Sequence, residues 1–221
     1  METFSAGPVS NRLARLLDDR CKDPSVSWPY HPRIGLGNAI LDYLISELAR
    51  ANPRLTEFEA AGTIQGQRNA LRGGARRRRK IDLVVDRSGR RPALAIEAKA
   101  CMTAHSRASS RLQAEIVASL DAILDEDPQA AFFAVVVVNF GDRFTSPLNL
   151  PGPNIHAPTD APALVDALSL GLSAVHEIRG VLLVPIKFDN ETGCELVTTS
   201  LPATFSPEGE FVSRIAKALD L

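Results

Sequence analysis

The chain has 221 residues and a mass of 23.8 kDa, which fits one α/β domain whose core needs no disulfide or structural metal. Its apolar fraction of 45% and charged fraction of 23% exclude a collagen-like, coiled-coil or wholly disordered protein. The longest apolar run, residues 130–138, is too short to span a membrane. Three widely spaced cysteines and the lack of a signal-like N-terminus favour a cytoplasmic protein.

The formal net charge of −1 conceals an uneven distribution. Residues 68–91 contain ten basic and two acidic residues, whereas the other 197 residues contain 15 basic and 24 acidic ones. The densest part of this basic segment is a run of five residues, Arg76, Arg77, Arg78, Arg79 and Lys80. Because such a run attracts polyanions, we expect it to contact a nucleic acid; a solvated loop or a localisation signal is the ordinary alternative.

The first half of the chain reads as short helices followed by strands. We expect residues up to 9 to be disordered or loosely docked. Helices over 10–19 and 36–51, a strand over 55–64, and a basic loop or hairpin arm over 65–80 should follow. Strands over 81–86 and 93–99 follow, joined by a tight turn at 88–91.

The second half alternates helices and strands more regularly. We expect a helix over 106–127, a strand buried on both faces over 131–139, an irregular loop over 141–162, a helix over 163–177, strands over 181–188 and 195–199, and a helix over 207–219. The loop over 141–162 contains five prolines, and loops of that length are usually functional or mobile. This alternation predicts an α/β fold with a mixed sheet flanked by helices.

The informative charges lie on the predicted hairpin. A two-residue turn at Gly89-Arg90 would place Val84 opposite Ala95 and Asp82 opposite Glu97. Glu97 and Lys99 are two residues apart, so their side chains point to the same face of the strand. Three charged side chains would therefore converge on one face.

Two facing carboxylates repel each other, and a hard cation such as Mg²⁺ would offset that repulsion. Water bound to such a cation becomes a nucleophile near neutral pH, and a neighbouring lysine can orient or deprotonate it. The pattern therefore predicts hydrolysis of a phosphodiester bond, with the arginine run holding the backbone of the substrate.

Asp82, fourteen further residues and then Glu97-Ala98-Lys99 resemble the motif of the PD-(D/E)xK nuclease superfamily, which includes type II restriction endonucleases, resolvases and repair nucleases. The resemblance covers residues 36–140 of one domain, with 141–221 completing the fold or serving dimer and DNA contacts. It implies a restriction-endonuclease-like three-layer sandwich. It also implies Mg²⁺-dependent cleavage of double-stranded DNA by a homodimer of the type II restriction class.

The resemblance also assigns roles to individual residues. Asp82, Glu97 and the backbone carbonyl of Ala98 would hold one or two metal ions, and Lys99 would be the catalytic lysine. Many members add an acid from a preceding element; Glu47 is preferred here over the other candidates, Asp42, Glu57 and Glu59.

Three other interpretations stay open. A structure-specific nuclease would use the same residues, and a non-catalytic DNA-binding module would keep only the fold. In an unrelated α/β protein, the spacing would be a coincidence and Glu97 and Lys99 would be solvated.

On the helix after the motif, Arg107 and Arg111 would contact phosphates or form a salt-bridged face with Glu115.

Overall fold

The computed structural model describes residues 2–22, 46–60, 64–71, 78–87, 91–146, 154–156, 160–189 and 191–220. Its described strands build one large sheet in the order β2-β3-β4-β5-β8-β9. These strands are β2 (Ile64–Leu71), β3 (Arg78–Asp86), β4 (Pro92–Cys101), β5 (Ala131–Asn139), β8 (Ile178–Asp189) and β9 (Gly193–Leu196). β4, β5 and β8 run parallel, and the other neighbours are antiparallel, so the predicted mixed sheet is confirmed.

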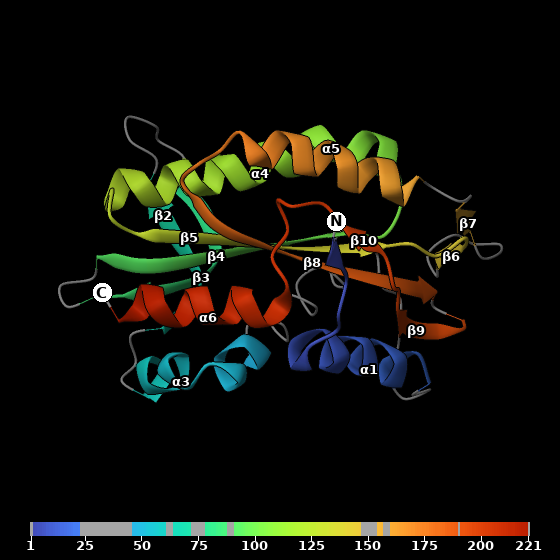
Figure 1. Ribbon diagram of the computed structural model, residues 1–221, viewed down its shortest axis with the longest axis horizontal. Helices are drawn as coiled ribbons and strands as arrows, with labels where there is room; N and C mark the ends of the chain where they lie inside the picture. The colour runs from blue at the N-terminus through green and yellow to red at the C-terminus, as the bar shows by residue number, and fades with distance from the viewer. Residues whose placement is uncertain are drawn as a thin grey trace.

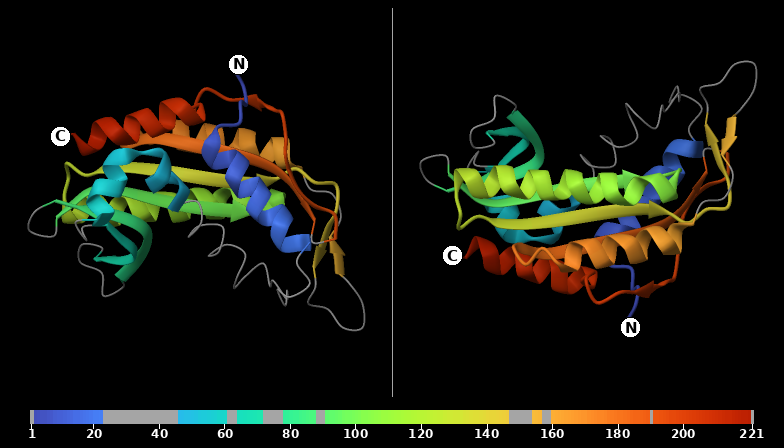
Figure 2. Two further views of the ribbon diagram at one scale, coloured as in Figure 1. Left: turned by 90° about the horizontal axis from the view of Figure 1, so that it is seen from below. Right: turned by 90° about the horizontal axis from the view of Figure 1, so that it is seen from above.

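Helices cover both faces of the sheet (Figure 1). α4 (His105–Glu126) and α5 (Ala161–Ser173) lie on one face. α1 (Pro8–Lys22), α3 (Pro53–Ala60) and α6 (Glu208–Leu219) lie on the other, and Figure 2 shows the same arrangement from below and above. The chain therefore has an α/β architecture compatible with a three-layer sandwich.

β5 forms the centre of the core, with the bounds predicted from its apolar run. Alternate side chains serve opposite layers: Phe132 and Val136 belong to the apolar cluster that includes α4 and α5, and Phe133 and Val137 to the cluster that includes α1 and α6. A strand enclosed by helices on both faces has no solvated side, so its sequence is continuously apolar rather than alternating.

The strand predicted over 55–64 is wrong, because residues Pro53–Ala60 form helix α3. Asn52 ends the preceding helical turn and also starts α3: its side-chain Oδ1 accepts the backbone N–H of Arg54 at 3.1 Å. Pro53 suits the first turn of a helix, where no N–H is needed. Asn52-Pro53 is thus a start signal as well as a stop signal. Of the helix predicted over 36–51, residues 46–51 are helical, and 36–45 lie outside the described residues.

Three further segments contain strands, and one of them is the stretch for which a hairpin arm was one of two expected alternatives. Part of the stretch 65–80 forms β2 and the start of β3, which makes it a hairpin arm. β1 (Glu2–Thr3) pairs with β10 (Ser200–Leu201), so of the two alternatives for the N-terminal residues, the docked one is found. Within 141–162, β6 (Phe144–Ser146) pairs with β7 (Asn154–His156). β1 and β10 are only two residues long and lie far apart in the sequence, and β6 and β7 are three residues long, so local patterns do not indicate them.

The first turn of α1 is capped by a residue from the other end of the chain. The carboxylate of Glu208 accepts the backbone N–H groups of Val9 at 2.7 Å and Ser10 at 3.0 Å, and the Ser10 hydroxyl at 2.5 Å. A Cβ on Gly7 would lie only 2.2 Å from Oε1 of Glu208, so this approach requires glycine. Glu208 is itself buried, and the bonds fix α1 against α6.

No helix among the described residues is long and apolar enough to cross a membrane.

We predict that Glu208→Ala lowers the free energy of unfolding by about 2–3 kcal/mol, because it leaves buried N–H groups at the start of α1 without an acceptor. Urea unfolding measures this change. Glu210→Ala is the matched control, since the Glu210 side chain is 49% exposed and forms a surface ion pair with Arg214. Equal stability of the two variants would contradict the capping role.

Candidate active site

The β3–β4 hairpin brings the predicted residues together. Val84 pairs with Ala95, as the predicted register required, and the ladder ends at Leu83 and Ile96. Asp82 and Glu97 therefore do not form the paired rung that the register predicts. Instead, Oδ2 of Asp82 accepts the backbone N–H of Ala98 at 2.9 Å, so a side-chain oxygen replaces the backbone acceptor where the ladder stops.

The other end of the hairpin also departs from the simple register. A bulge between Val85 and Asp86 shifts the pairing, so that Asp86 lies opposite Pro92. The N–H of Arg87 then donates to the carbonyl of Arg91 at 2.7 Å. The predicted turn residues Gly89 and Arg90 lie outside the described residues. The shift leaves the register at the site end unchanged.

Asp82 and Glu97 are buried, with 6% and 1% of their surface exposed. The ammonium group of Lys99 lies 2.5 Å from Oε1 of Glu97, and 19% of the Lys99 side chain is exposed. The second carboxylate oxygen of Glu97, Oε2, is buried and has no hydrogen-bond partner in the described part of the chain. Glu97 and Lys99 are thus not the solvated strand charges of the ordinary alternative.

The pKa of Glu97 is raised above its usual value, first because burial penalises the charged carboxylate and then because Asp82 is negatively charged. Lys99 and Arg79 oppose this rise with their positive charges. Two buried acids thus share one electrostatic environment.

Arg79 lies in the wall of this site. Its Nη2 is 3.9 Å from Oε1 of Glu97 and donates to the backbone carbonyl of Glu115 at 2.7 Å, while its Nε donates to Oγ of Ser119 at 3.0 Å. Only 30% of the side chain is exposed. The sequence did not predict that Arg79 packs between Glu97 and α4, because the neighbouring residues of the run are also arginines.

Glu115 is a second acid near Lys99, in addition to Glu97. Its Oε2 lies 3.9 Å from the Lys99 ammonium group, and its Oε1 lies 3.0 Å from Nη1 of Arg111. The Arg111–Glu115 salt bridge was one of the two alternatives that their four-residue spacing left open, and the structure contains it. The spacing did not show that Glu115 faces Lys99, because that depends on how α4 packs on β4.

Of the further acids proposed from sequence, the two whose side chains are described, Glu47 and Glu57, do not join Asp82 and Glu97. Among the described residues, no group of three or more histidine, cysteine, aspartate or glutamate side chains is placed to hold a metal ion. Glu47 is buried, and its two oxygens each lie 2.6 Å from an arginine, Arg12 and Arg50. Glu57 pairs with Arg54 at the surface. Asp42 and the side chain of Glu59 lie outside the described residues.

The other basic residues predicted to contact DNA are only partly described. Lys80, Arg107 and Arg111 are exposed, as a phosphate contact requires. Arg76, Arg77 and the side chain of Arg78 lie outside the described residues. Arg79 is therefore the member of the run whose contacts are known, and they are internal.

The donor set fits a hard divalent cation. Asp82 and Glu97 offer carboxylate oxygens, and the buried Oε2 of Glu97 lacks any hydrogen bond among the described residues. Mg²⁺ is commonly held by one or two carboxylates and completes its shell with water. A thiol nucleophile is a poor alternative, because burial raises the pKa of nearby Cys101 to about 11 and keeps it protonated.

Comparison with known proteins assigns no family to this arrangement. No family model and no curated protein matches the sequence. What the site can do therefore follows from its own side chains and their geometry.

The raised pKa of Glu97 predicts a pH-dependent stability. The folded state holds the Glu97 proton more tightly than the unfolded chain, whose carboxyl has a pKa near 4.5. Without metal, the free energy of unfolding should therefore fall as the pH rises from that value through the folded pKa of Glu97. Glu97→Gln should lack this component and be more stable than wild type at neutral pH by about 1 kcal/mol.

Urea unfolding at several pH values, with a chelator present, measures this difference. Glu57→Gln serves as the control, because its side chain is 65% exposed. If Glu97→Gln and wild type kept the same pH dependence, Glu97 would not be the group responsible.

Proposed function

We propose that this protein is a metal-dependent nuclease that hydrolyses phosphodiester bonds of double-stranded DNA. One observation supports the proposal above all others: a carboxylate oxygen of Glu97 is buried without a hydrogen bond among the described residues, beside Asp82 and with Lys99 within 2.5 Å of the other oxygen. Burying two acids is unfavourable unless something compensates them. A divalent cation supplies that compensation and suits the chemistry.

The cation would be Mg²⁺, held by Asp82 and Glu97 with the backbone carbonyl of Ala98 as a further candidate. When bound, it would lower the pKa of a water molecule and stabilise negative charge on the phosphate. The Ala98 N–H holds Asp82 in place at 2.9 Å, which restricts that carboxylate before any cation binds. Such preorganisation lowers the cost of assembling the site.

Lys99 is the catalytic cation of the proposal. Its ammonium group is partly exposed, which places a positive charge where a phosphate can reach it. In the hydrolysis, the oxygen of water bonds to phosphorus as a phosphorus–ester oxygen bond breaks, and negative charge develops on the phosphoryl oxygens. The water loses a proton to solvent, and the leaving ester oxygen takes one up from solvent to become a hydroxyl group. Lys99 would orient the water and stabilise that charge. Two further charged side chains lie near it: Glu115 is 3.9 Å from the Lys99 ammonium group, and Arg79 is 3.9 Å from Glu97, to which Lys99 is bound.

Duplex DNA is the preferred substrate because the basic segment 68–91 adjoins the site in sequence and includes Arg79 of its wall. We infer a type II restriction endonuclease that acts as a homodimer, since two-fold symmetry places two sites on the two strands of a palindrome. Discrete fragments from phage DNA distinguish this class from a junction-cleaving nuclease.

Cleavage of unmethylated phage DNA in Mg²⁺ tests the proposal. We predict discrete fragments with wild type, roughly hundredfold slower cleavage with Asp82→Asn or Glu97→Gln, and a smaller reduction with Lys99→Gln, because only the first two remove metal ligands. DNA binding should persist in all three variants. Mg²⁺ should also raise the melting temperature of wild type but not of Glu97→Gln.

Glu57→Gln and Glu47→Gln are the acid controls, since neither carboxylate lies with Asp82 and Glu97. Full cleavage by Asp82→Asn and Glu97→Gln would refute the assigned site. Binding without cleavage of duplexes or junctions by wild type would leave a non-catalytic DNA-binding module.

The internal contacts of Arg79 predict that it serves the active site, whereas Arg76, Arg77 and Arg78 bind DNA. In chelator, replacing Arg76, Arg77 and Arg78 by glutamine should flatten the salt dependence of DNA affinity by about 0.9 logarithmic units for each phosphate that is no longer neutralised. Arg79→Gln should leave that slope unchanged and slow cleavage in Mg²⁺, because its guanidinium is bound to α4. A filter-binding series over salt concentration measures the slopes. The reverse pattern would show that Arg79 binds the phosphate backbone.

A further inference from the structure

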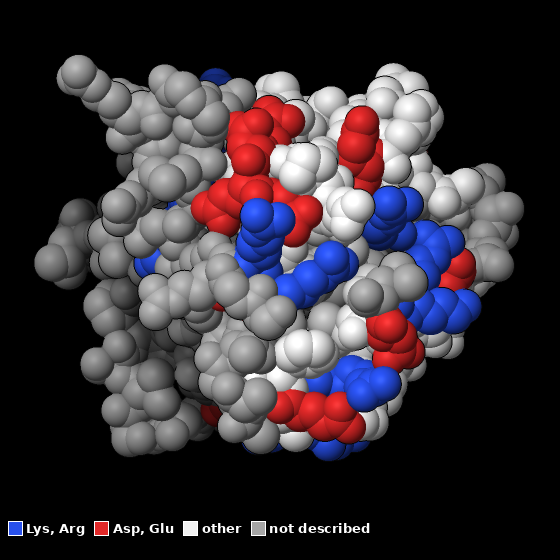
Figure 3. All heavy atoms as spheres, turned by 90° about the vertical axis from the view of Figure 1, so that its left-hand side faces the viewer, with Lys and Arg blue, Asp and Glu red and all other residues white. Residues whose placement is uncertain are grey.

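A second concentration of positive charge lies away from Asp82, Glu97 and Lys99. A cavity of about 310 Å³ opens at the end of the sheet where the parallel strands β4, β5 and β8 begin. Four basic residues line it: Arg87 follows β3, Arg179 lies near the start of β8, and Arg214 and Lys217 come from α6. Figure 3 shows this side of the molecule, with Lys and Arg across the middle and right of the face and Asp and Glu above, below and in places between them.

The remaining lining is mainly apolar. Ala93, Ala131 and Phe133 come from the beginnings of β4 and β5, and Ala218 comes from α6. Ala93 and Phe133 are buried. The cavity therefore combines a cationic rim with an apolar floor, which suits a ligand that has an anionic group and an apolar body.

Most of the rim charge is not neutralised within the described residues. Arg214 pairs with Glu210 at 2.5 Å and donates to the backbone carbonyl of Arg179 at 3.0 Å. No ion pair to a described acidic side chain engages Arg87, Arg179 or Lys217. Three cations thus line one small cavity without a described acid paired to them, and an oxyanion bound there would be attracted by all three.

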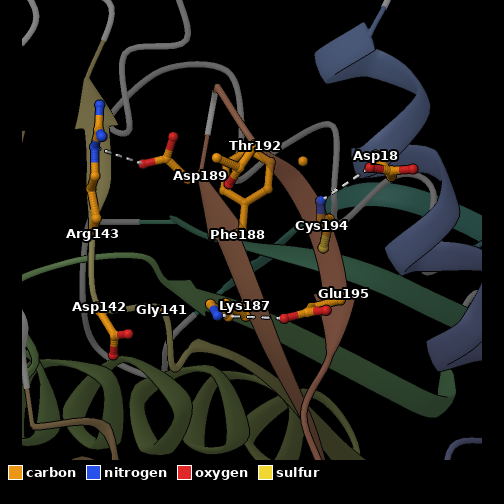
Figure 4. Close-up of a pocket in the computed structure, with 11 residues that line it drawn as sticks. Asp18, Gly141, Asp142, Arg143, Lys187, Phe188, Asp189, Thr192, Cys194 and Glu195 are labelled. Atoms are coloured by element: carbon orange, nitrogen blue, oxygen red, sulfur yellow. Dashed lines mark hydrogen bonds and ion pairs between the residues drawn. The ribbon is translucent and has the colours of Figure 1, made fainter.

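A cavity at the opposite end of the sheet shows the contrast (Figure 4). It measures about 500 Å³ and also contains basic residues, but these face acids. Lys187 lies 3.6 Å from Glu195, and Arg143 pairs with Glu191 and Asp189. That cavity therefore has no surplus of positive charge to attract an anion.

We propose that the cavity between β4, β5, β8 and α6 is a binding site for a small organic phosphate of mononucleotide size or less. The guanidinium groups of Arg87 and Arg179 can each offer a fork of N–H donors to phosphate oxygens, and Lys217 adds a point charge. A phosphate monoester carries nearly two negative charges, which matches several unpaired cations better than a carboxylate does. The apolar floor receives the organic part. Its volume lies at the small end of ligand cavities.

Calorimetric titration with 5′-AMP, adenosine and inorganic phosphate tests this site, in low salt and with a chelator so that no cleavage occurs. We expect 5′-AMP to bind, adenosine not to bind, and inorganic phosphate to bind more weakly than 5′-AMP. Arg179→Gln and Lys217→Gln should each weaken 5′-AMP binding about tenfold, the reduction expected on removing one charge-assisted hydrogen bond. Arg179→Gln keeps the backbone carbonyl that Arg214 uses, so the fold should be unaffected.

Arg15→Gln is the matched control, because Arg15 is an exposed arginine of α1 outside the cavity. The proposal is overturned if wild type does not bind 5′-AMP, or if Arg179→Gln binds it as wild type does. If inorganic phosphate bound as tightly as 5′-AMP, the apolar floor would not bind the organic part of the ligand. If only duplex DNA bound more weakly to Arg179→Gln, the cations would belong to a nucleic-acid surface instead. None of these readouts depends on nuclease activity.

Discussion

Two acids buried next to each other impose a free-energy cost on the metal-free fold. Asp82 and Glu97 are almost wholly inaccessible to water, and the charge of Asp82 helps raise the pKa of Glu97. The surrounding structure provides partial compensation: the Ala98 N–H bonds Asp82, and Lys99 and Arg79 face Glu97. One oxygen of Glu97 still lacks a hydrogen bond among the described residues, so the compensation is incomplete.

The fold makes this arrangement possible because β4 lies between an antiparallel and a parallel neighbour. Along β5, β4 stays paired from Leu94 to Cys101, which fixes the backbone of Glu97 and Lys99 on a rigid strand. Along β3, the ladder stops at Leu83, and the end of that pairing leaves the Ala98 N–H for the Asp82 carboxylate. α4 then supplies Glu115 and Ser119 from outside the sheet. Strand, interrupted ladder and helix each contribute a different part of the site.

Local patterns in the sequence predict those features that depend on neighbouring residues. The apolar run of β5, the Val84–Ala95 register and the acid–acid–lysine grouping all follow from spacing along one or two strands. Long-range features were not predictable in this way. The docked N-terminus and the inward side chain of Arg79 depend on partners far away in sequence. The helix at Pro53–Ala60 begins at a local signal, because Asn52-Pro53 can start a helix as well as end one. The sequence does not distinguish an arginine that faces solvent from one that packs against a helix beside an acid. Only the tertiary packing does.

The charges around Glu97 also indicate how metal and substrate would be coupled under the proposed function. Three carboxylates, those of Asp82, Glu97 and Glu115, face three cations, those of Lys99, Arg79 and Arg111, so the group is formally neutral. A bound divalent cation would give it a net charge of about +2. The site would then attract a phosphodiester that it has little electrostatic reason to hold when empty. Each ligand would strengthen binding of the other, since coupling between two sites is reciprocal. Cleavage would thus be confined to the state in which both are present.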